Sequence, residues 1–128
     1  QESNAILLYA VFRLQKGNSG AIWERMREVE ADRRRKGHFK YPSAGSVFKN
    51  NRSFGQPSGK ILDELGLRGI THGGAQIAPF HANIIINTGS AGAEDVRHLI
   101  LHAQRAAYEK RNIVLEPEIR LVGDWSDV

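Results

Sequence analysis

The sequence predicts one α+β domain in which a small sheet packs against two longer helices. Apolar runs of strand length alternate with segments of helical periodicity, and glycine, proline and asparagine mark the turns between them. No internal repeat, low-complexity segment or interdomain linker interrupts the order strand, helix, loop, helix, strand, helix, strand. With 128 residues, 41% of them hydrophobic, the chain is long enough to bury a core.

The first expected strand covers residues 5–14, which are rich in Ile, Leu, Val, Tyr and Phe. Its longest apolar run, residues 5–12, is too short to span a bilayer and has no basic region before it, so we expect no membrane partner. A turn over residues 16–20 follows, and Asn18 or Ser19 then caps the first helix.

The first helix carries Ile22, Met26 and Val29 on one stripe, and Gly37 can end it in a left-handed conformation. Basic residues gather at positions 33–36, where they form either a phosphate-binding patch or a solvated helix end favoured by the macrodipole. The whole chain has 18 basic and 14 acidic residues, a net charge of +4. This excess favours anionic ligands such as nucleic acid, a nucleotide-sugar or phosphate.

The second half of the chain contains the remaining expected elements. A helix starts at Ser58 and ends at Gly66, and the β-branched run of residues 83–87 predicts a strand covered on both faces. The longest helix begins at Ser90 or Gly92 and is followed by a last strand through Ile119 and Leu121. Its buried stripe is expected to contain Val96, Leu99, Ile100 and Ala103.

Metal sites and cysteine chemistry are not expected. The absence of cysteine excludes disulfides, a thiolate nucleophile and cysteine metal ligands, and a cytoplasmic protein fits this composition. His98 and His102 have the spacing of metal ligands on a helix, but helical rotation places them opposite the buried stripe. We therefore expect both histidines to be solvated.

The turn over residues 41–50 differs most from ordinary scaffold. Pro42 fixes one φ angle, Gly45 allows an approach that a Cβ would block, and Ser46 presents a hydroxyl near Lys49 and Asn50. One interpretation is a turn leading into a strand. Another is the Ser-x-x-Lys pair of acyl-transfer enzymes, which needs a helix that this sequence disfavours and partner motifs that the chain lacks.

Two further patterns allow a structural and a functional interpretation. The Gly-x-x-Gly pattern of residues 66–69 matches the loop of KH-type RNA-binding domains, although Gly66 is also the expected helix stop. Glu118 and Arg120 would share one face of the last strand, either as a solvated charge pair or beside a ligand.

Five blocks of sequence, in this order, resemble the C-terminal part of MurB-type UDP-N-acetylenolpyruvoylglucosamine reductase, and the resemblance extends from Leu7 to Val122. The short connection between Asn50 and Gly59 is similar to the type II branch of the family. The five blocks are YPSAGSVFKN (41–50), SGKILDELGLRG (58–69), HGGAQ (72–76), HAN (81–83) and LEPEIR (115–120).

The resemblance implies an oxidoreductase, UDP-N-acetylmuramate dehydrogenase, with bound FAD. In this family NADPH reduces the flavin, whose N5 gives a hydride to the enolpyruvyl double bond of UDP-N-acetylglucosamine enolpyruvate. The product, UDP-N-acetylmuramate, serves peptidoglycan synthesis in the cytoplasm and thus cell-wall biogenesis, cell shape and cell division. The implied partners are this substrate and the flavin-binding lobe, with neither nucleic acid nor a membrane.

The resemblance also implies residue roles. Ser46 matches the proton donor, and Glu118 matches the carboxyl group that stabilises the enolate, which it can do only as the protonated acid. Asn50, Arg68 and His81 match positions near the substrate diphosphate. Arg120 would face the flavin edge, and no metal is implied.

Two departures from the family pattern are local. Asn51 stands where the family usually has Pro, and Gly37-His38 replaces a common Gln-Pro, so fine loop geometry is affected. A larger departure is that no dinucleotide fingerprint occurs in the chain. We expect residues 1–15 to be a lead-in strand or the last strand of the flavin-binding lobe, and residues 16–128 to be the substrate-binding domain, inactive alone. The alternative is a small RNA- or nucleotide-binding module without catalysis.

Overall fold

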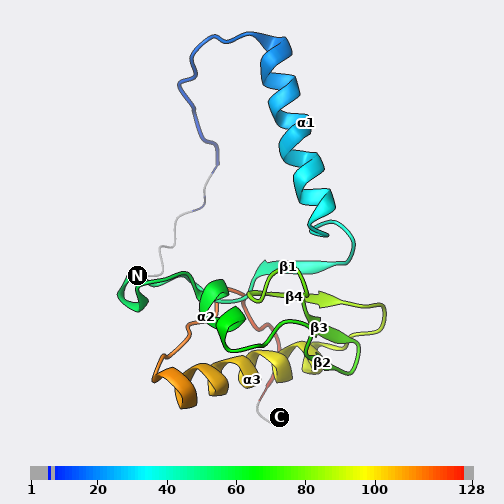
Figure 1. Ribbon diagram of the computed structural model, residues 1–128, viewed down its shortest axis with the longest axis vertical. Helices are drawn as coiled ribbons and strands as arrows, with labels where there is room; N and C mark the ends of the chain where they lie inside the picture. The colour runs from blue at the N-terminus through cyan, green and yellow to red at the C-terminus, as the bar shows by residue number, and fades with distance from the viewer. Residues whose placement is uncertain (1–5, 7, 126–128) are drawn as a thin grey trace. The chain divides into compact units, whose positions relative to one another are not determined.

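A computed structural model describes residue 6 and residues 8–125, and its element order is shown in Figure 1. The chain divides into two compact units, residues 1–32 and residues 33–128, which are described separately. The elements are α1 (Ser19–Arg35), β1 (Ser43–Ser46), the 3-10 helix η1 (Arg52–Phe54), α2 (Ser58–Glu64), β2 (Thr71–His72), β3 (Ala75–Ile77), β4 (Ile84–Asn87) and α3 (Ala93–Arg111).

The second unit is built on a four-stranded antiparallel sheet with the order β1-β4-β3-β2. Side chains of successive strand residues point to opposite faces, so the run of isoleucines in β4 serves two cores. Ile85 packs with α3 residues in the larger core, whereas Ile84 and Ile86 pack with Ala78 on the other face. This confirms the expectation of a strand covered on both faces, and the α+β class is confirmed as well.

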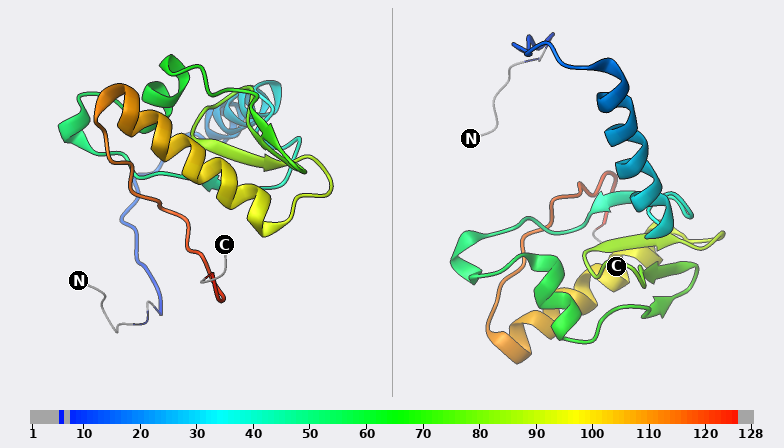
Figure 2. Two further views of the ribbon diagram at one scale, coloured as in Figure 1. Left: turned by 90° about the horizontal axis from the view of Figure 1, so that it is seen from below. Right: turned by 45° about the horizontal axis from the view of Figure 1, so that its top comes forward.

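α3 covers one face of the sheet and lies against β2 and β3 (Figure 2). Three residues of its expected stripe, Leu99, Ile100 and Ala103, are at most 3% exposed, and Ala107 is buried with them, whereas Val96 is only partly buried. Asp95 fixes the start of the helix, because its Oδ2 accepts hydrogen bonds from the backbone N of Gly92 (3.0 Å) and of Gly74 (3.1 Å). These two bonds lower the pKa of the Asp95 carboxyl and tie α3 to the β2–β3 turn.

The β2–β3 hairpin was not expected from the sequence, which predicted only a glycine-rich segment there. Its strands have two and three residues, too few to show an alternating pattern. Gly74 is needed because a Cβ at this position would overlap the backbone of Ser90 and Ala91. The hairpin therefore depends on a close backbone approach rather than on strand propensity.

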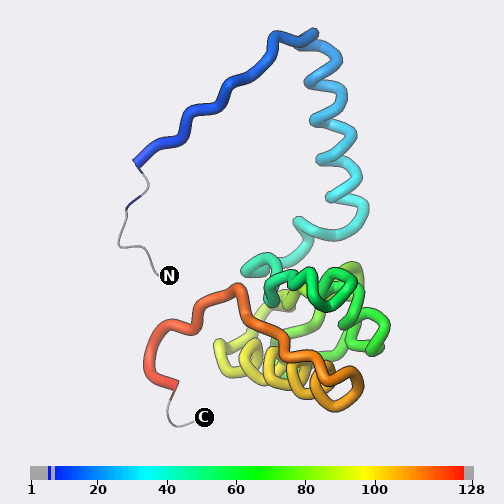
Figure 3. The backbone as a smooth tube through the Cα atoms, turned by 90° about the vertical axis from the view of Figure 1, so that its left-hand side faces the viewer, coloured from blue at the N-terminus to red at the C-terminus, as the bar shows by residue number. Residues whose placement is uncertain are grey.

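The expected last strand through Ile119 and Leu121 is wrong. The segment after α3 turns back (Figure 3) and forms an isolated bridge between Pro117 and Phe48. The backbone N of Glu118 donates to the carbonyl of Val47 (2.8 Å). The backbone N of Lys49 donates to the carbonyl of Glu116 (2.9 Å), so these two hydrogen bonds flank the bridge on either side.

The first unit contains most of α1 and the segment before it. Asn18 caps α1 as expected, since its Oδ1 accepts from the backbone N of Ala21 (3.0 Å). Gly37 adopts a φ of 87° after the helix, as predicted.

Residue 6 and residues 8–18 form no helix or strand. The strand expected at 5–14 is therefore absent from its described part, while residues 5 and 7 lie outside the description. Among the described residues, no helix is long and apolar enough to cross a bilayer.

Candidate ligand-binding site

A cavity of about 340 Å³ opens between the end of β1, the start of α2 and the loop before β4. It brings together Ser46 and the three residues predicted to lie near a diphosphate, Asn50, Arg68 and His81. The other lining residues are Pro57, Gly59, Lys60, Asp63 and Asn83. Most of these side chains are polar, and two of them are cationic.

Asn50 holds the start of α2 against the end of the β1 segment. Its Oδ1 accepts from the backbone N of Ser58 (2.9 Å), and the Ser58 hydroxyl donates to the carbonyl of Lys49 (2.6 Å). Ser58 is fully buried. Because the Asn50 oxygen accepts this bond, its two amide N–H groups are the donors that the side chain can offer to a ligand.

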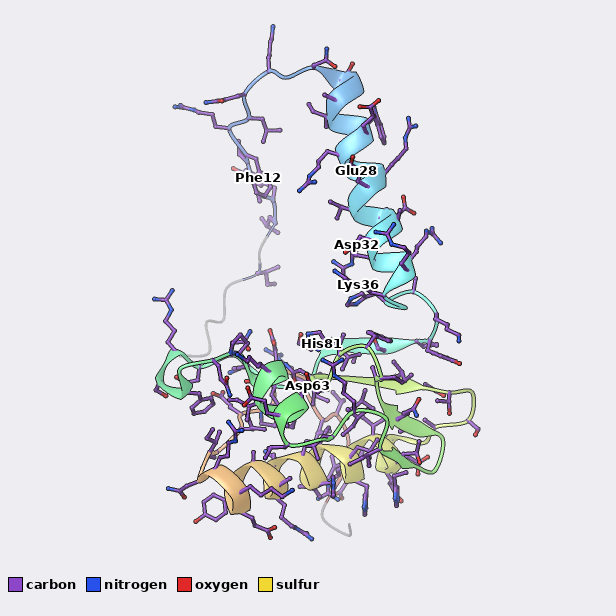
Figure 4. All side chains as sticks on the ribbon, in the orientation of Figure 1. Phe12, Glu28, Asp32, Lys36, Asp63 and His81 are labelled. Carbon is purple, nitrogen blue, oxygen red and sulfur yellow. The ribbon has the colours of Figure 1, made fainter. Side chains whose placement is uncertain are left out.

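His81 lies in the loop between β3 and β4, near Asp63 of α2; Figure 4 labels both residues. Its Nδ1 accepts from the backbone N of Asn83 (3.2 Å). Burial lowers the pKa of His81 from its ordinary value of 6.5, and His38 and Arg68 lower it further. The ring is therefore neutral near pH 7, with the proton on Nε2 available for donation.

Gly59 makes the position of His81 possible. A Cβ on Gly59 would stand 2.8 Å from Cε1 of His81, which is closer than real Cβ atoms approach. The glycine at this position of α2 thus leaves room for the imidazole ring at the cavity wall. The sequence offered Gly59 as part of a family block, without this reason.

Asn83 was missed as a site residue. It is 3% exposed, accepts from the backbone N of Phe48 (2.9 Å) and donates through Nδ2 to the Phe48 carbonyl (2.9 Å). These bonds fix the segment after Ser46 to the loop that carries His81. A buried asparagine of this kind has no pattern in a single sequence that would distinguish it from a turn residue.

Asp63 and Lys60 were also missed. Asp63 accepts from Nη2 of Arg68 (2.6 Å) and also pairs with its Nε. Both side chains are a little less than half exposed. The helical spacing of Lys60 and Asp63 is that of an ordinary solvated face, so the sequence carried no signal for either residue.

Ser46 ends β1 and is exposed at the cavity. The pairing of β1 with β4 shifts register between Ser43 and Ser46, and Gly45 between them has a φ of 84°. No atom of the protein lies within 4 Å of the position that a Gly45 Cβ would take, so the expected close approach at Gly45 is not made by the chain itself and stays a prediction for a ligand. The contribution of Gly45 is the left-handed backbone that turns Ser46.

Glu118 and Arg120 do not line the cavity. The Glu118 backbone lies beside Val47, the neighbour of Ser46, through the hydrogen bond that joins them. Both predicted residues are exposed, and the strand that would have placed them on one face is not formed. An apolar cavity of about 220 Å³ also adjoins β1, with Pro42, Gly45 and Ile119 among its lining residues.

His98 and His102 are exposed on α3, as expected. The ring of His98 stacks on that of His72 with their centroids 3.7 Å apart and their planes nearly parallel at 5°. Within the part of the chain that the structure describes, no three His, Cys, Asp or Glu residues are grouped to hold a metal ion.

The Gly-x-x-Gly loop is held by interactions inside the domain. Gly66 adopts a φ of 76° after α2, and the backbone N of Gly69 donates to the carbonyl of Ile77 (2.8 Å). Arg68 is paired with Asp63. The loop therefore serves as a helix stop and a strand lead-in, and the RNA-binding alternative is not favoured.

Comparisons with known proteins agree with this arrangement. The family described as UDP-N-acetylenolpyruvoylglucosamine reductase, C-terminal domain, matches residues 37–122. A protein of Treponema denticola named UDP-N-acetylenolpyruvoylglucosamine reductase is 48% identical over 124 residues, which are 97% of this chain and 38% of that protein. A protein of the same name from Caldicellulosiruptor saccharolyticus is 44% identical over 127 residues, 98% of this chain and 40% of that protein.

A solved structure gives the same result for the fold. The crystal structure of UDP-N-acetylenolpyruvylglucosamine reductase (MurB) from Thermus caldophilus matches with a TM-score of 0.62 and 35% identity. The match covers 84% of this chain and 37% of the other. The chain thus spans about two fifths of the length of the curated relatives it matches.

Proposed function

The chain belongs to the UDP-N-acetylenolpyruvoylglucosamine reductase family as its C-terminal domain, and from this premise we propose that it is the substrate-binding lobe of that enzyme. The whole enzyme would use NADPH and FAD to convert UDP-N-acetylglucosamine enolpyruvate into UDP-N-acetylmuramate for peptidoglycan synthesis in the cytoplasm. The observation that carries the proposal is the cavity in which Ser46, Asn50, Arg68 and His81 converge.

The chemistry of the cavity fits the diphosphate of a nucleotide-sugar. Lys60 and Arg68 supply positive charge, and Asn50 and neutral His81 supply N–H donors. A volume of about 340 Å³ is at the lower end of the range for small-molecule sites, which suits one part of this large substrate. Asn50, Arg68 and His81 are accordingly the proposed substrate-binding residues.

Ser46 is the proposed proton donor. Reduction of the enolpyruvyl group adds a hydride to one carbon of the double bond and a proton to the other, with negative charge developing on the carboxylate side as an enolate. The Ser46 hydroxyl, turned toward the cavity by Gly45, would give that proton to the carbon. A serine hydroxyl is a weak acid, so this step requires a strongly basic carbanion and close geometry.

Glu118 is the proposed enolate stabiliser. Its backbone lies beside the residue that follows Ser46, which supports a position near the reacting end of the substrate. As the protonated acid it would donate a hydrogen bond to the developing enolate. The side chain is exposed in this chain, and we propose that the flavin-binding lobe and the substrate enclose it in the whole enzyme.

The flavin, when bound, supplies the hydride. The apolar cavity lined in part by Gly45 and Ile119 would be the place for an apolar part of the flavin, and Arg120 follows Ile119 in the chain. Nothing in the chain resembles a dinucleotide-binding loop, so most of the cofactor would be held by the other lobe. The chain alone is therefore expected to be inactive.

The segment before α1 is proposed to belong to the sheet of that other lobe. Its side chains Ile6, Leu8, Val11 and Leu14 are 83–85% exposed, which is unfavourable for a run of apolar residues in water. Pairing as a strand within a second lobe would cover them. We therefore propose that residues 1–15 belong to the flavin-binding lobe or lead into it, and that residues 16–128 form the substrate-binding domain.

The test is Ser46→Ala in an enzyme that contains both lobes. We expect reduction of UDP-N-acetylglucosamine enolpyruvate to be lost while NADPH still reduces the flavin, measured separately by stopped-flow absorbance. Ser90→Ala is the matched control, because Ser90 is an exposed serine in the loop before α3 and lines neither of the two cavities. Unchanged turnover of the Ser46 variant would remove Ser46 from the role of proton donor.

A further inference from the structure

One residue of the cavity, Asp63, has no role in the proposed function, although it is paired with Arg68. Asp63 lies in the last turn of α2, and Arg68 follows in the turn that Gly66 begins with its left-handed backbone. The Arg68 side chain folds back onto Asp63, which accepts from Nη2 and Nε of the guanidinium. Both residues line the cavity.

This contact determines which edge of the guanidinium is left for a ligand. Asp63 occupies the side formed by Nε and Nη2, while the N–H groups of Nη1 and the second N–H of Nη2 remain. Those groups form the terminal edge of the planar fork, which binds phosphate oxygens in a bidentate manner. A lysine would supply the charge at this position without such an edge.

We infer that Asp63 is a positioning residue, which holds the Arg68 guanidinium so that its terminal edge faces the diphosphate of the nucleotide-sugar. The inference rests on the proposed function, because it assumes that the cavity takes this ligand. Asp63 touches Arg68 and acts on the ligand through it.

Two effects of Asp63 oppose each other. Its carboxylate removes positive charge from a cavity that binds an anion, which weakens binding. It also fixes a long side chain that otherwise loses much rotamer freedom when the ligand binds. Asp63 and Arg68 are 40% and 45% exposed, so water and salt screen the charge effect. Orientation is therefore the larger effect.

The test is a calorimetric titration of the 128-residue chain with UDP-N-acetylglucosamine. Asp63→Asn is expected to weaken binding about two- to tenfold, which is the cost of ordering one long side chain. Asp63→Glu is expected to restore part of the affinity. Equal or tighter binding by Asp63→Asn would overturn the inference, because that is the result if charge alone governs the site.

A double-mutant cycle separates positioning from a general structural effect. In an Arg68→Lys background, Asp63→Asn is expected to leave affinity unchanged or to raise it, since an ammonium has no fork to orient. An equal loss in both backgrounds would contradict the positioning role. Glu28→Gln is the matched control: its carboxylate forms an exposed ion pair with Arg25 and does not line the cavity, so affinity should not change.

The binding results distinguish failure of the inference from failure of the proposed function. If the unaltered chain and all variants show no saturable binding, both are overturned. If the unaltered chain binds and Arg68→Ala weakens binding while Asp63→Asn does not, only the inference is overturned. Thermal unfolding of each variant should change little, because exposed ion pairs contribute little to stability.

Discussion

Helices α1 and α3 have similar lengths and similar apolar stripes, but only the stripe of α3 is buried. α3 buries Leu99 and Ile100 at 1% and 3% exposure, whereas Met26 and Val29 of α1 are 55% and 47% exposed. α1 has no buried residue at all. Helical periodicity therefore predicts that a segment is a helix and which face is apolar, but the partner of that face need not lie in the same chain.

The same difference separates the sheet from the segment before α1. The isoleucines of β4 gain their burial from α3 on one face and from Ala78 and its neighbours on the other. The apolar residues of 8–14 have a comparable composition and are 78–85% exposed where they are large. In the sheet domain the sequence supplies both sides of these contacts, whereas within the first unit the large apolar side chains described remain exposed.

The largest expected contrast is between core truncations of the two helices. Leu99→Ala should lower the free energy of unfolding by about 2–5 kcal/mol, because it leaves a cavity in the packed core. Met26→Ala should change it by no more than about 0.5 kcal/mol, as for other surface substitutions. Urea unfolding of both variants measures the difference, and similar losses would contradict the comparison.

Gly74→Ala should be the next largest effect. A Cβ at Gly74 would overlap the backbone of Ser90 and Ala91, so the β2–β3 turn and the start of α3 must move apart at a cost of about 1–3 kcal/mol. Gly89→Ala is the steric control, since no atom lies within 4 Å of the Cβ position there, although its φ of 142° adds some strain. A Gly74 variant as stable as the parent in urea would show that this close approach is unimportant.

Removal of residues 1–32 should affect the sheet domain less. Because α1 buries none of its side chains, the domain formed by residues 33–128 is expected to unfold within about 1 kcal/mol of the longer chain. The shorter chain should also expose less apolar surface. A dye that fluoresces on binding apolar surface should therefore give a weaker signal with the shorter chain. Loss of cooperative unfolding in the shorter chain would mean that the first unit contributes to the core.

The smallest expected effect is a pH dependence from His81. Its pKa is lowered in the folded chain by burial, with His38 and Arg68 adding repulsion and Asp63 opposing it. The unfolded chain therefore binds more protons near pH 6.5 and below, so His81 contributes stability above that pH and loses it as the pH falls through the lowered pKa.

We expect thermal stability to fall between pH 7.5 and about pH 5. His81→Gln should show a smaller fall over the same range, because glutamine does not titrate. An equal pH dependence in the parent and in the variant would exclude His81 as its source.

Much of the fold could be predicted because helical periodicity, apolar runs and capping residues are visible in short stretches of sequence. The helix starting at Asn18, the strand around Ile85 and the long helix with Leu99 were all visible as periodicity and capping. The β2–β3 hairpin was not, because its strands are too short for a pattern. The absent strand after Pro117 had the right composition, but it formed only a single bridge.

The residues of the candidate site also fall into a predicted group and a missed group. Ser46, Asn50, Arg68 and His81 were named from family blocks, and they line one cavity. Asp63, Lys60 and Asn83 were missed because their contribution is a contact between segments far apart in the sequence or an ordinary surface spacing. Such contacts follow from the packed structure and leave no local signature.

One measurement tests the central claim, that the domain of residues 33–128 carries a nucleotide-sugar site. Amide NMR spectra of the 128-residue chain would be recorded during a titration with UDP-N-acetylglucosamine. We predict saturable shifts centred on Asn50, Arg68 and His81. Shifts confined to residues 33–36, or none at millimolar ligand, would contradict the claim.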